Sequence, residues 1–158
     1  RNLVFGCPRN RNRPENAEES EVLSFFHELG IYAEAHNTVL ALEANPPIYH
    51  TNYINNTEDA IALIKRISIS GFQLNLDVGT MLENGENIDG LRKNWVCVNH
   101  VHISEPSLAP IQKRDLHREL ADALRLNDYS GYVSIEMGNQ SSMEQIIKAM
   151  AYVAEVFG

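Results

Sequence analysis

The sequence lacks long apolar runs, has few cysteines and is short of basic residues. No apolar stretch approaches the ~18 residues of a membrane-spanning helix, so we expect neither a membrane span nor a membrane partner. Cys7 and Cys97 are far apart and form no CxxC pair, which argues against a disulfide framework and favours a reducing cytoplasm. With 13 Lys and Arg against 21 Asp and Glu, the net charge of −8 argues against nucleic acid as a partner.

What is present is a repeated alternation of strand-like and helix-like segments. Hydrophobic residues make up 44% of the 158 residues and charged residues 22%, as in one soluble globular domain. Short apolar runs occupy residues 3–7, 38–43, 72–78, 96–104 and 132–137. Helical patterns occupy residues 17–35, 58–67, 88–93, 114–126 and 142–156. This alternation predicts a parallel α/β sheet and no second domain.

A polar residue recurs near the end of four of these strands. Glu43, Asp77, His102 and Glu136 are separated by 34, 25 and 34 residues, a mean of 31. This mean matches the ~31 residues of one unit in a (β/α)8 TIM barrel of about 250 residues. Units of an open, doubly wound sheet are similar in length, so the spacing only favours the barrel.

The alternation of side chains across each strand strengthens that preference. Leu74 and Leu76 lie opposite Asp77, and strict alternation puts Val98 on the same face as His102. Helices cover both faces of a doubly wound sheet, where polar residues on one face of successive strands are costly. In a barrel that face points inward, and its carboxyl end is the usual active-site mouth. We therefore expect a (β/α)8 barrel.

Three carboxylates and one imidazole then converge at the barrel mouth. Without a cation, like-charge repulsion raises the pKa values of the carboxyl groups. A divalent metal removes that cost, and the mixed oxygen and nitrogen donors suit Mn²⁺, Mg²⁺, Co²⁺ or Zn²⁺. The sequence therefore predicts one divalent metal ion, with Mn²⁺ as the first choice, held by Glu43, Asp77, His102 and Glu136.

Four segments around these residues, LALEANP, LNLDVGTM, HVHISEP and YVSIEMGN, resemble the last four strands of the xylose isomerase-like barrels, in particular the sugar phosphate isomerase/epimerase group. The opening LVFGCPRNR is similar to the preceding strand and loop, so the resemblance covers residues 1–158 as one domain, strands four to eight. It implies that the same four residues bind one catalytic metal, with His102 rather than His100 as the ligand.

The resemblance also implies an isomerase or epimerase that acts on a sugar or a sugar phosphate. The metal polarises the substrate carbonyl and stabilises an enediolate. Glu43 and Glu136 serve as the acid–base pair on opposite faces of the substrate. The superfamily also includes abasic-site endonucleases, but their multi-metal sites need more ligands than this chain offers.

The chain departs from the epimerase pattern at three positions. Thr80, Leu108 and Tyr49 stand where many epimerases carry a His, an Arg and an acidic residue. Two alternatives therefore stay open. One is a related metal-dependent dehydratase (a lyase) acting on a polyol or keto acid, and the other is a non-catalytic truncated barrel that serves as a binding or interaction protein.

Further polar residues near the strand ends are candidates for substrate contacts: Arg11, Asn45, Tyr49, His100 and Glu105, with His50, Asn52 and His117 as additional choices. Arg11, together with Arg9 and Arg13, is a candidate anchor for a substrate phosphate or carboxylate, because guanidinium groups match such oxyanions. Asn45 is placed to orient Glu43, and His100 to act as a donor behind the metal ligands.

At about 31 residues per unit, 158 residues correspond to five of the eight units of a barrel. Arg1 in place of Met, and a strand that starts at residue 3, indicate a truncated product or a barrel closed by another copy. Because an open sheet exposes two edges, we expect a homo-oligomer or association through those edges. The full-length protein is expected to be an isomerase, whereas five units alone can hold metal without turning over a substrate.

Overall fold

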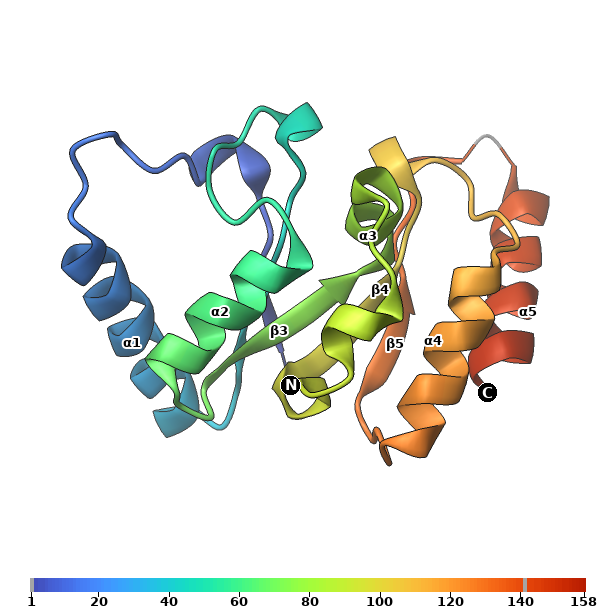
Figure 1. The fold of residues 1–158 in the computed structure, drawn as a ribbon. Helices are drawn as coiled ribbons and strands as arrows, with labels where there is room; N and C mark the ends of the chain where they lie inside the picture. Colours follow the sequence, from blue (N-terminus) through green and yellow to red (C-terminus); the bar gives the residue numbers. More distant parts are fainter. Residues whose placement is uncertain (1, 141) are drawn as a thin grey trace.

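Five parallel strands form a single sheet in the computed structural model, which describes residues 2–140 and 142–158. The strands are β1 (Leu3–Phe5), β2 (Leu40–Glu43), β3 (Phe72–Asp77), β4 (Val98–Ile103) and β5 (Tyr132–Ile135). Each strand pairs with the next one along the chain. The sheet curls into a half-barrel, which confirms the predicted partial (β/α)8 barrel (Figure 1).

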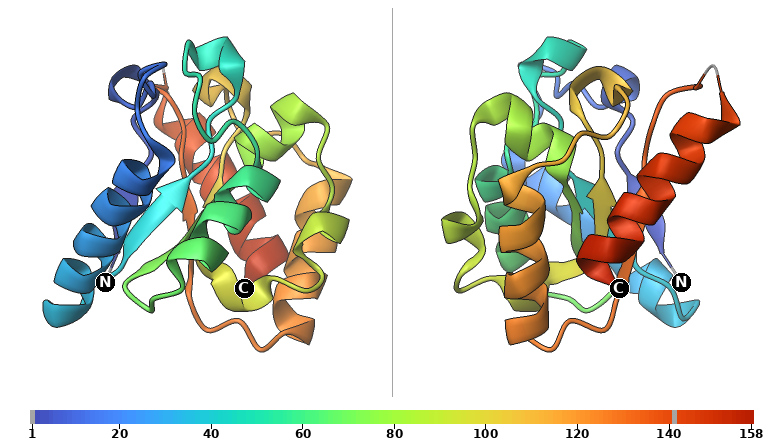
Figure 2. Two further views of the ribbon diagram at one scale, coloured as in Figure 1. Left: turned by 60° about the vertical axis from the view of Figure 1, so that its left-hand side comes forward. Right: turned by 90° about the vertical axis from the view of Figure 1, so that its right-hand side faces the viewer.

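The helices cover one face of this sheet and leave the other open. They are α1 (Glu19–Ala35), α2 (Thr57–Ile67), α3 (Val78–Asn84), α4 (Asp115–Leu126) and α5 (Met143–Phe157). In Figure 1, α1 and α2 lie on one side of the sheet's centre and α4 and α5 on the other. The loops that follow the strands gather at one end of the molecule, the upper end in both views of Figure 2. Within the described ranges, no helix has both the length and the apolar character to cross a bilayer.

The core lies between the sheet and these helices, as the alternation along the strands requires. Leu42, Leu74, Leu76 and Ile103 are at most 1% exposed and project from the helix-covered face. Helices α2 and α4 place apolar residues at helical spacing against them. The opposite, concave face therefore carries the polar residues of the strands.

Strict alternation fails at one point in β4. Leu74 pairs with Val98, but the next residue of β3, Asn75, pairs with His100, so Asn99 is the extra residue of a β-bulge. Val98 consequently packs in the core beside Leu74, and the prediction that it shares a face with His102 is wrong. The bulge returns His100 and the residues after it to the expected faces.

The helix predicted over residues 88–93 is also wrong. That stretch holds only a 3-10 helix, Ile88–Leu91, while α3 follows β3 directly. Asp77 caps α3 by accepting a hydrogen bond from the Thr80 N–H, and Gly85 ends it with a left-handed backbone (φ 65°). Gly90 lowers the helix propensity of the segment that follows.

Helix α1 crosses close to the start of β3, and this contact generates the first prediction. A Cβ atom on Gly71 would lie 2.0 Å from the carbonyl oxygen of Gly30 in α1, so helix backbone would have to move. We expect Gly71→Ala to destabilise the protein by roughly 1–3 kcal/mol, measured by urea unfolding. Gly90→Ala, where nothing lies within 4 Å of the added atom, is the control and should stay within about 0.5 kcal/mol of the parent. Equal effects of the two substitutions would contradict the close contact.

Candidate metal centre

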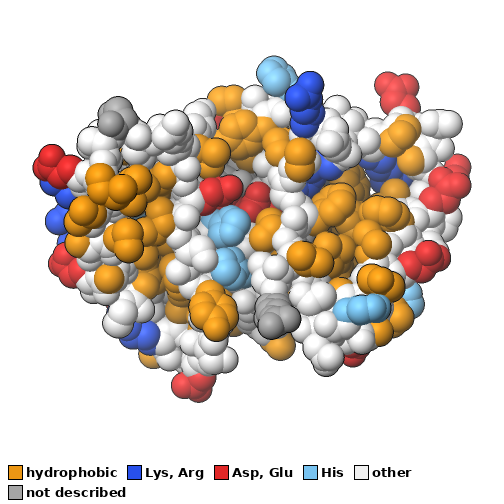
Figure 3. Space-filling view, turned by 180° about the vertical axis from the view of Figure 1, so that it is seen from behind, with side chains coloured by type: hydrophobic (Ala, Val, Ile, Leu, Met, Phe, Trp, Pro, Cys, Tyr) orange, Lys and Arg blue, Asp and Glu red, His pale blue; other side chains and the backbone are white. Residues whose placement is uncertain are grey.

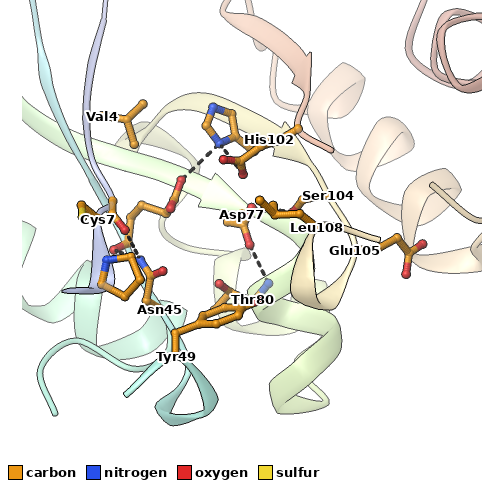
Figure 4. Close-up of a pocket in the computed structure, with 14 residues that line it drawn as sticks. Val4, Cys7, Asn45, Tyr49, Asp77, Thr80, His102, Ser104, Glu105 and Leu108 are labelled. Carbon is orange, nitrogen blue, oxygen red and sulfur yellow. Dashed lines mark hydrogen bonds and ion pairs between the residues drawn. The ribbon is translucent and has the colours of Figure 1, made fainter. Parts of the chain in front are cut away.

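Four side chains from four successive strands meet at the carboxyl end of the concave face. Glu43 ends β2, Asp77 ends β3, His102 lies in β4 and Glu136 follows β5. Each offers one ligand atom, and these atoms all lie within 4.8 Å of one another. Figure 4 shows the close-up, and Figure 3 shows acidic and histidine side chains in a hollow between two apolar regions.

His102 lies between two carboxylates. Its Nδ1 is 3.1 Å from Glu43 Oε2 and 3.4 Å from Glu136 Oε2. Burial lowers the pKa of His102, but the two carboxylates outweigh burial and raise this pKa to about 10. In the metal-free protein a proton on His102 thus supplies the positive charge of the cluster. Its contribution to stability is complete below the ordinary histidine pKa and is lost as pH rises through about 10.

At Asp77, burial and a neighbouring carboxylate both disfavour the charged form. Burial and the nearby charge of Glu43 raise the pKa of Asp77 to about 6. Two hydrogen bonds oppose this shift: Ser104 Oγ donates to Oδ2 at 2.5 Å, and the Thr80 N–H donates to Oδ1 at 2.6 Å. Asp77 is thereby held in place while its ionised form stays unfavourable without a cation.

These features fit a divalent metal. His102 Nδ1 is buried near the carboxylates of Glu43 and Glu136. It makes no hydrogen bond of good geometry to any group in the described part of the chain. Three carboxylates and an imidazole form a donor set of the kind that Mn²⁺, Mg²⁺, Co²⁺ and Zn²⁺ accept. A cation at this position would offset the burial and the charge of Glu43 that together raise the pKa of Asp77.

The cluster opens into a pocket of about 400 Å³. Its walls come from the strand ends and the loops after them, including Val4, Cys7, Asn45, Tyr49, Thr80 and Leu108. A pocket of this size accommodates a small organic substrate.

Comparison with known proteins gives the fold family. Over residues 2–156 the sequence matches a family model described as the xylose isomerase-like TIM barrel. The chain belongs to this family. A search of curated protein sequences found no significant match.

Solved structures of the xylose isomerase-like fold are similar over almost the whole chain. A 3-keto-D-glucoside 4-epimerase from E. coli is 21% identical, with a TM-score of 0.77 over 98% of this chain and 63% of its own. A D-psicose 3-epimerase is 15% identical, with a TM-score of 0.80 over 99% and 64%. An AP endonuclease of family 2 from Brucella melitensis is 19% identical, with a TM-score of 0.76 over 98% and 60%. The chain thus spans less than two thirds of the length of these structures.

Several residues predicted to contact substrate lie outside the pocket of this xylose isomerase-like chain. Arg11 is buried behind the cluster, where its Nη1 donates to the backbone carbonyl of Glu43 and its guanidinium lies 5.9 Å from the Phe5 ring centroid. Burial lowers the pKa of Arg11, and the charge of Glu43 opposes this effect. Arg11 is therefore placed to hold the backbone at Glu43 rather than a substrate oxyanion.

The other residues of the arginine-rich loop are also engaged away from the pocket. Arg13 donates from Nη2 to the Ala17 carbonyl, and its backbone exchanges two hydrogen bonds with the side chain of Asn52. Arg9 and His50 are exposed and line no part of the pocket. His117 is fully buried between helices, with Nδ1 3.0 Å from Tyr152 Oη.

Four further predicted contact residues lie around the site. Asn45 lines the pocket and donates to the Gly6 carbonyl at 2.8 Å, and Tyr49 lines it with its hydroxyl accepting from the Ser107 N–H at 2.7 Å. His100 lies behind the cluster, its Nε2 2.9 Å from Ser134 Oγ and its ring edge-on to His102. Glu105 borders the pocket, but its carboxylate pairs with Arg114 and points away (Figure 4).

Two residues that support the site were not predicted from the sequence. Asn75 donates from Nδ2 to Glu43 Oε2 at 2.5 Å, and Ser104 bridges Asp77 and the Gly79 N–H. In the sequence, each is a polar residue on the inward face within two or three positions of a candidate ligand. Many surface strands share this pattern, so it does not identify a site residue by itself.

The raised pKa of Asp77 yields a pH-dependent prediction for the metal-free protein. The folded pKa of about 6 lies above the ordinary value of 3.8, so the contribution of this group to stability is complete below pH 3.8 and is lost as pH rises through about 6. We expect Asp77→Asn to raise the melting temperature in chelator by more at pH 8 than at pH 5, because pH 5 lies between the ordinary and the folded pKa values of Asp77. At the same time it should abolish stabilisation by Mn²⁺.

The control for this experiment is Asp122→Asn, which removes an exposed carboxylate of α4. It should leave the melting temperature nearly unchanged at both pH values. A loss of stability in Asp77→Asn that is equal at pH 5 and pH 8 would contradict the electrostatic account.

Proposed function

We propose that the protein is a divalent-metal-dependent sugar isomerase or epimerase. The observation that carries the proposal is the cluster of Glu43, Asp77, His102 and Glu136 at the carboxyl ends of four successive strands. This cluster opens into a pocket. The similar solved structures include three proteins titled as sugar epimerases, a 3-keto-D-glucoside 4-epimerase, a D-psicose 3-epimerase and an L-ribulose 3-epimerase. The described residues provide ligands for one metal, fewer than a multi-metal nuclease site requires.

Proton transfer falls to the two glutamates. Glu43 and Glu136 come from β2 and from the end of β5, with Asp77 and His102 between them along the sheet. A substrate carbonyl above the central pair presents one face to each glutamate. One glutamate takes the proton α to the carbonyl, and the other, protonated beforehand, donates its own proton to the opposite face, which inverts the carbon.

Glu43, Asp77, His102 and Glu136 would hold the metal, with Mn²⁺ as our first choice. When bound, it supplies Lewis-acid stabilisation of the negative charge that develops on the substrate oxygens. Asp77, fixed by Ser104 and Thr80, serves only as a ligand. This division of roles leaves acid–base work to the glutamates, of which Glu136 is the more exposed, with 41% of its side chain accessible.

The lining of the pocket favours a neutral sugar over a sugar phosphate. Among the described residues around it there is no Lys or Arg, and Arg11 is buried behind Glu43. Phosphate recognition commonly uses such cations or a helix N-terminus, and the N-terminus of α3 that borders this pocket is already capped by the Asp77 carboxylate. We therefore propose a ketose or keto-sugar without a phosphate group.

A catalytically silent sugar-binding barrel is the second candidate. Thr80, where related epimerases carry a His, donates its hydroxyl to the Ala44 carbonyl at 2.9 Å and so serves the loop. Leu108, where they carry an Arg, gives the pocket an apolar wall. A dehydratase would use the same metal cluster, and its products would appear in the assay below.

The enzymatic prediction concerns proton exchange. After removal of bound metal with chelator, addition of Mn²⁺ should raise the melting temperature, by an amount that corresponds to about 2.7 kcal/mol at a hundredfold excess over Kd. In D₂O, the metal-loaded protein should exchange the α-proton of a suitable ketose, followed by NMR. Glu136→Gln should lower this exchange by roughly 10²-fold or more.

The control variant is Glu155→Gln, an exposed carboxylate on α5, which should leave exchange unchanged. Metal binding without exchange on any ketose or ketose phosphate would favour the silent binding protein, and loss of water from the sugar would favour the dehydratase. Absence of metal binding would refute the proposal.

Residence in the cytoplasm stays a prediction from the two free cysteines.

We also propose that additional polypeptide segments cover the open edges of the sheet in the functional protein. Strands β1 and β5 are the ends of the sheet, and Leu3 and Tyr132 on them are 58% and 75% exposed. Exposed apolar residues continue onto α1 and α5, with Tyr32, Met143, Ile147 and Met150 each at least 58% exposed. Further barrel units or another copy of this chain would bury them.

Light scattering during size-exclusion chromatography tests this proposal. At micromolar concentration the molar mass measured for the 158-residue chain should exceed the 17.8 kDa of the monomer. The double substitution Ile147→Lys and Met150→Lys should shift it towards the monomer, because both side chains lie on the exposed face of α5. A monodisperse monomer of the unsubstituted chain would contradict association through the edges.

A further inference from the structure

Asn75 is a polar residue in the most buried part of the concave face. It is 0% exposed and lies in register with Glu43 on β2 and with His100 on β4. Its Nδ2 donates to Glu43 Oε2 at 2.5 Å, while its Oδ1 has no hydrogen-bond partner in the described chain. A buried amide with half of its hydrogen bonds unmet is an unfavourable way to fill a core, so packing alone does not account for it.

The carboxylate of Glu43 is confined from the opposite side as well. A Cβ atom on Gly6 in the loop after β1 would lie 2.5 Å from Glu43 Oε1, so only glycine leaves room for this oxygen. The backbone carbonyl of Glu43 accepts from Arg11 Nη1 and, at 3.4 Å, from Asn45 Nδ2. Glu43 Oε2 therefore accepts from Asn75 and also lies 3.1 Å from His102 Nδ1, while Oε1 is seated against Gly6.

We propose that Asn75 is a positioning residue that sets the orientation of the Glu43 carboxylate before the metal binds. The terminal torsion of a glutamate is broad and roughly twofold, so the Glu43 carboxylate samples more orientations when the Asn75 amide is removed. A fixed donor on Oε2 selects one of them and lowers the ordering cost of metal binding. The inference rests on the proposed role of Glu43 as a metal ligand.

Metal affinity measures this role without reference to catalysis. We expect Asn75→Ala to weaken Mn²⁺ binding roughly tenfold or more, followed by the electron paramagnetic resonance signal of free Mn²⁺. Gln73→Ala is the matched control, because Gln73 lies two residues earlier on the same face of β3 and contacts none of the four ligands. Its affinity should equal that of the parent.

A double-substitution cycle separates positioning from a general loss of structure. If Asn75 acts through Glu43, then Asn75→Ala should weaken Mn²⁺ binding in the parent and add little in the Glu43→Gln background. The visible absorption of bound Co²⁺, which reports ligand geometry, should change in Asn75→Ala and stay unchanged in Gln73→Ala. Additive effects in the cycle together with an unchanged Co²⁺ spectrum would overturn the proposal.

Gly6→Ala provides a second route if Asn75→Ala does not fold. The added methyl group meets the flexible end of Glu43, which can move, so the variant should fold while its carboxylate is displaced. Mn²⁺ affinity should fall in this variant too, and unchanged affinity would count against a preset carboxylate. If the parent binds no metal, the proposed function fails. If the parent binds metal, and Glu43→Gln weakens this binding while Asn75→Ala does not, only the role of Asn75 fails.

Discussion

Repulsion among three carboxylates at one end of a curled sheet is the constraint on which the rest of the site depends. Glu43, Asp77 and Glu136 each end or follow a strand, and the sheet brings them within ligand distance of one another. In the metal-free protein the proton on His102 relieves Glu43 and Glu136, while Asp77 keeps a raised pKa of about 6. A divalent cation is the one partner that satisfies all four groups at once.

The β-bulge at Asn99 allows both the core and the metal cluster to form from the same strand. With regular pairing onward from Leu74 and Val98, His102 would point towards the helices and Val101 towards the hollow. The extra residue reverses this, so Val98 stays in the core while His102 pairs with Asp77 on the inner face. Bulges commonly redirect side chains beside active sites, and here the redirected side chain offers the nitrogen donor among the four described side chains that could hold a metal ion.

Much of the fold and the ligand set followed from local patterns. Alternation and unit length were enough to predict five parallel strands and a polar residue near the end of four of them, whereas the choice of His102 over His100 rested on the family resemblance. The bulge was not predictable, since HVH on β4 reads as regular alternation and only pairing with β3 reveals the extra residue.

The substrate candidates were harder for the same physical reason. Arg11 and Glu105 look alike in sequence, each a charged residue just after a strand, yet one folds behind Glu43 and the other pairs with Arg114. The partners that decide these positions are tertiary. Arg11 meets a carbonyl 32 residues away in the chain, and no local pattern encodes that distance.

The half-barrel separates two requirements that a closed barrel would meet together. All four candidate ligands, and the groups that hold them, belong to strands and loops of this chain, so the proposed metal binding would depend on contacts already present. The pocket above them is walled only on the side that these strands provide, and its rim continues into the exposed edges at β1 and β5. Enclosure of a substrate, which excludes water and strengthens charge interactions, therefore depends on whatever covers those edges. Under the proposed function, changes at these edges should affect turnover more than metal affinity, whereas changes at Glu43 or Glu136 should affect both.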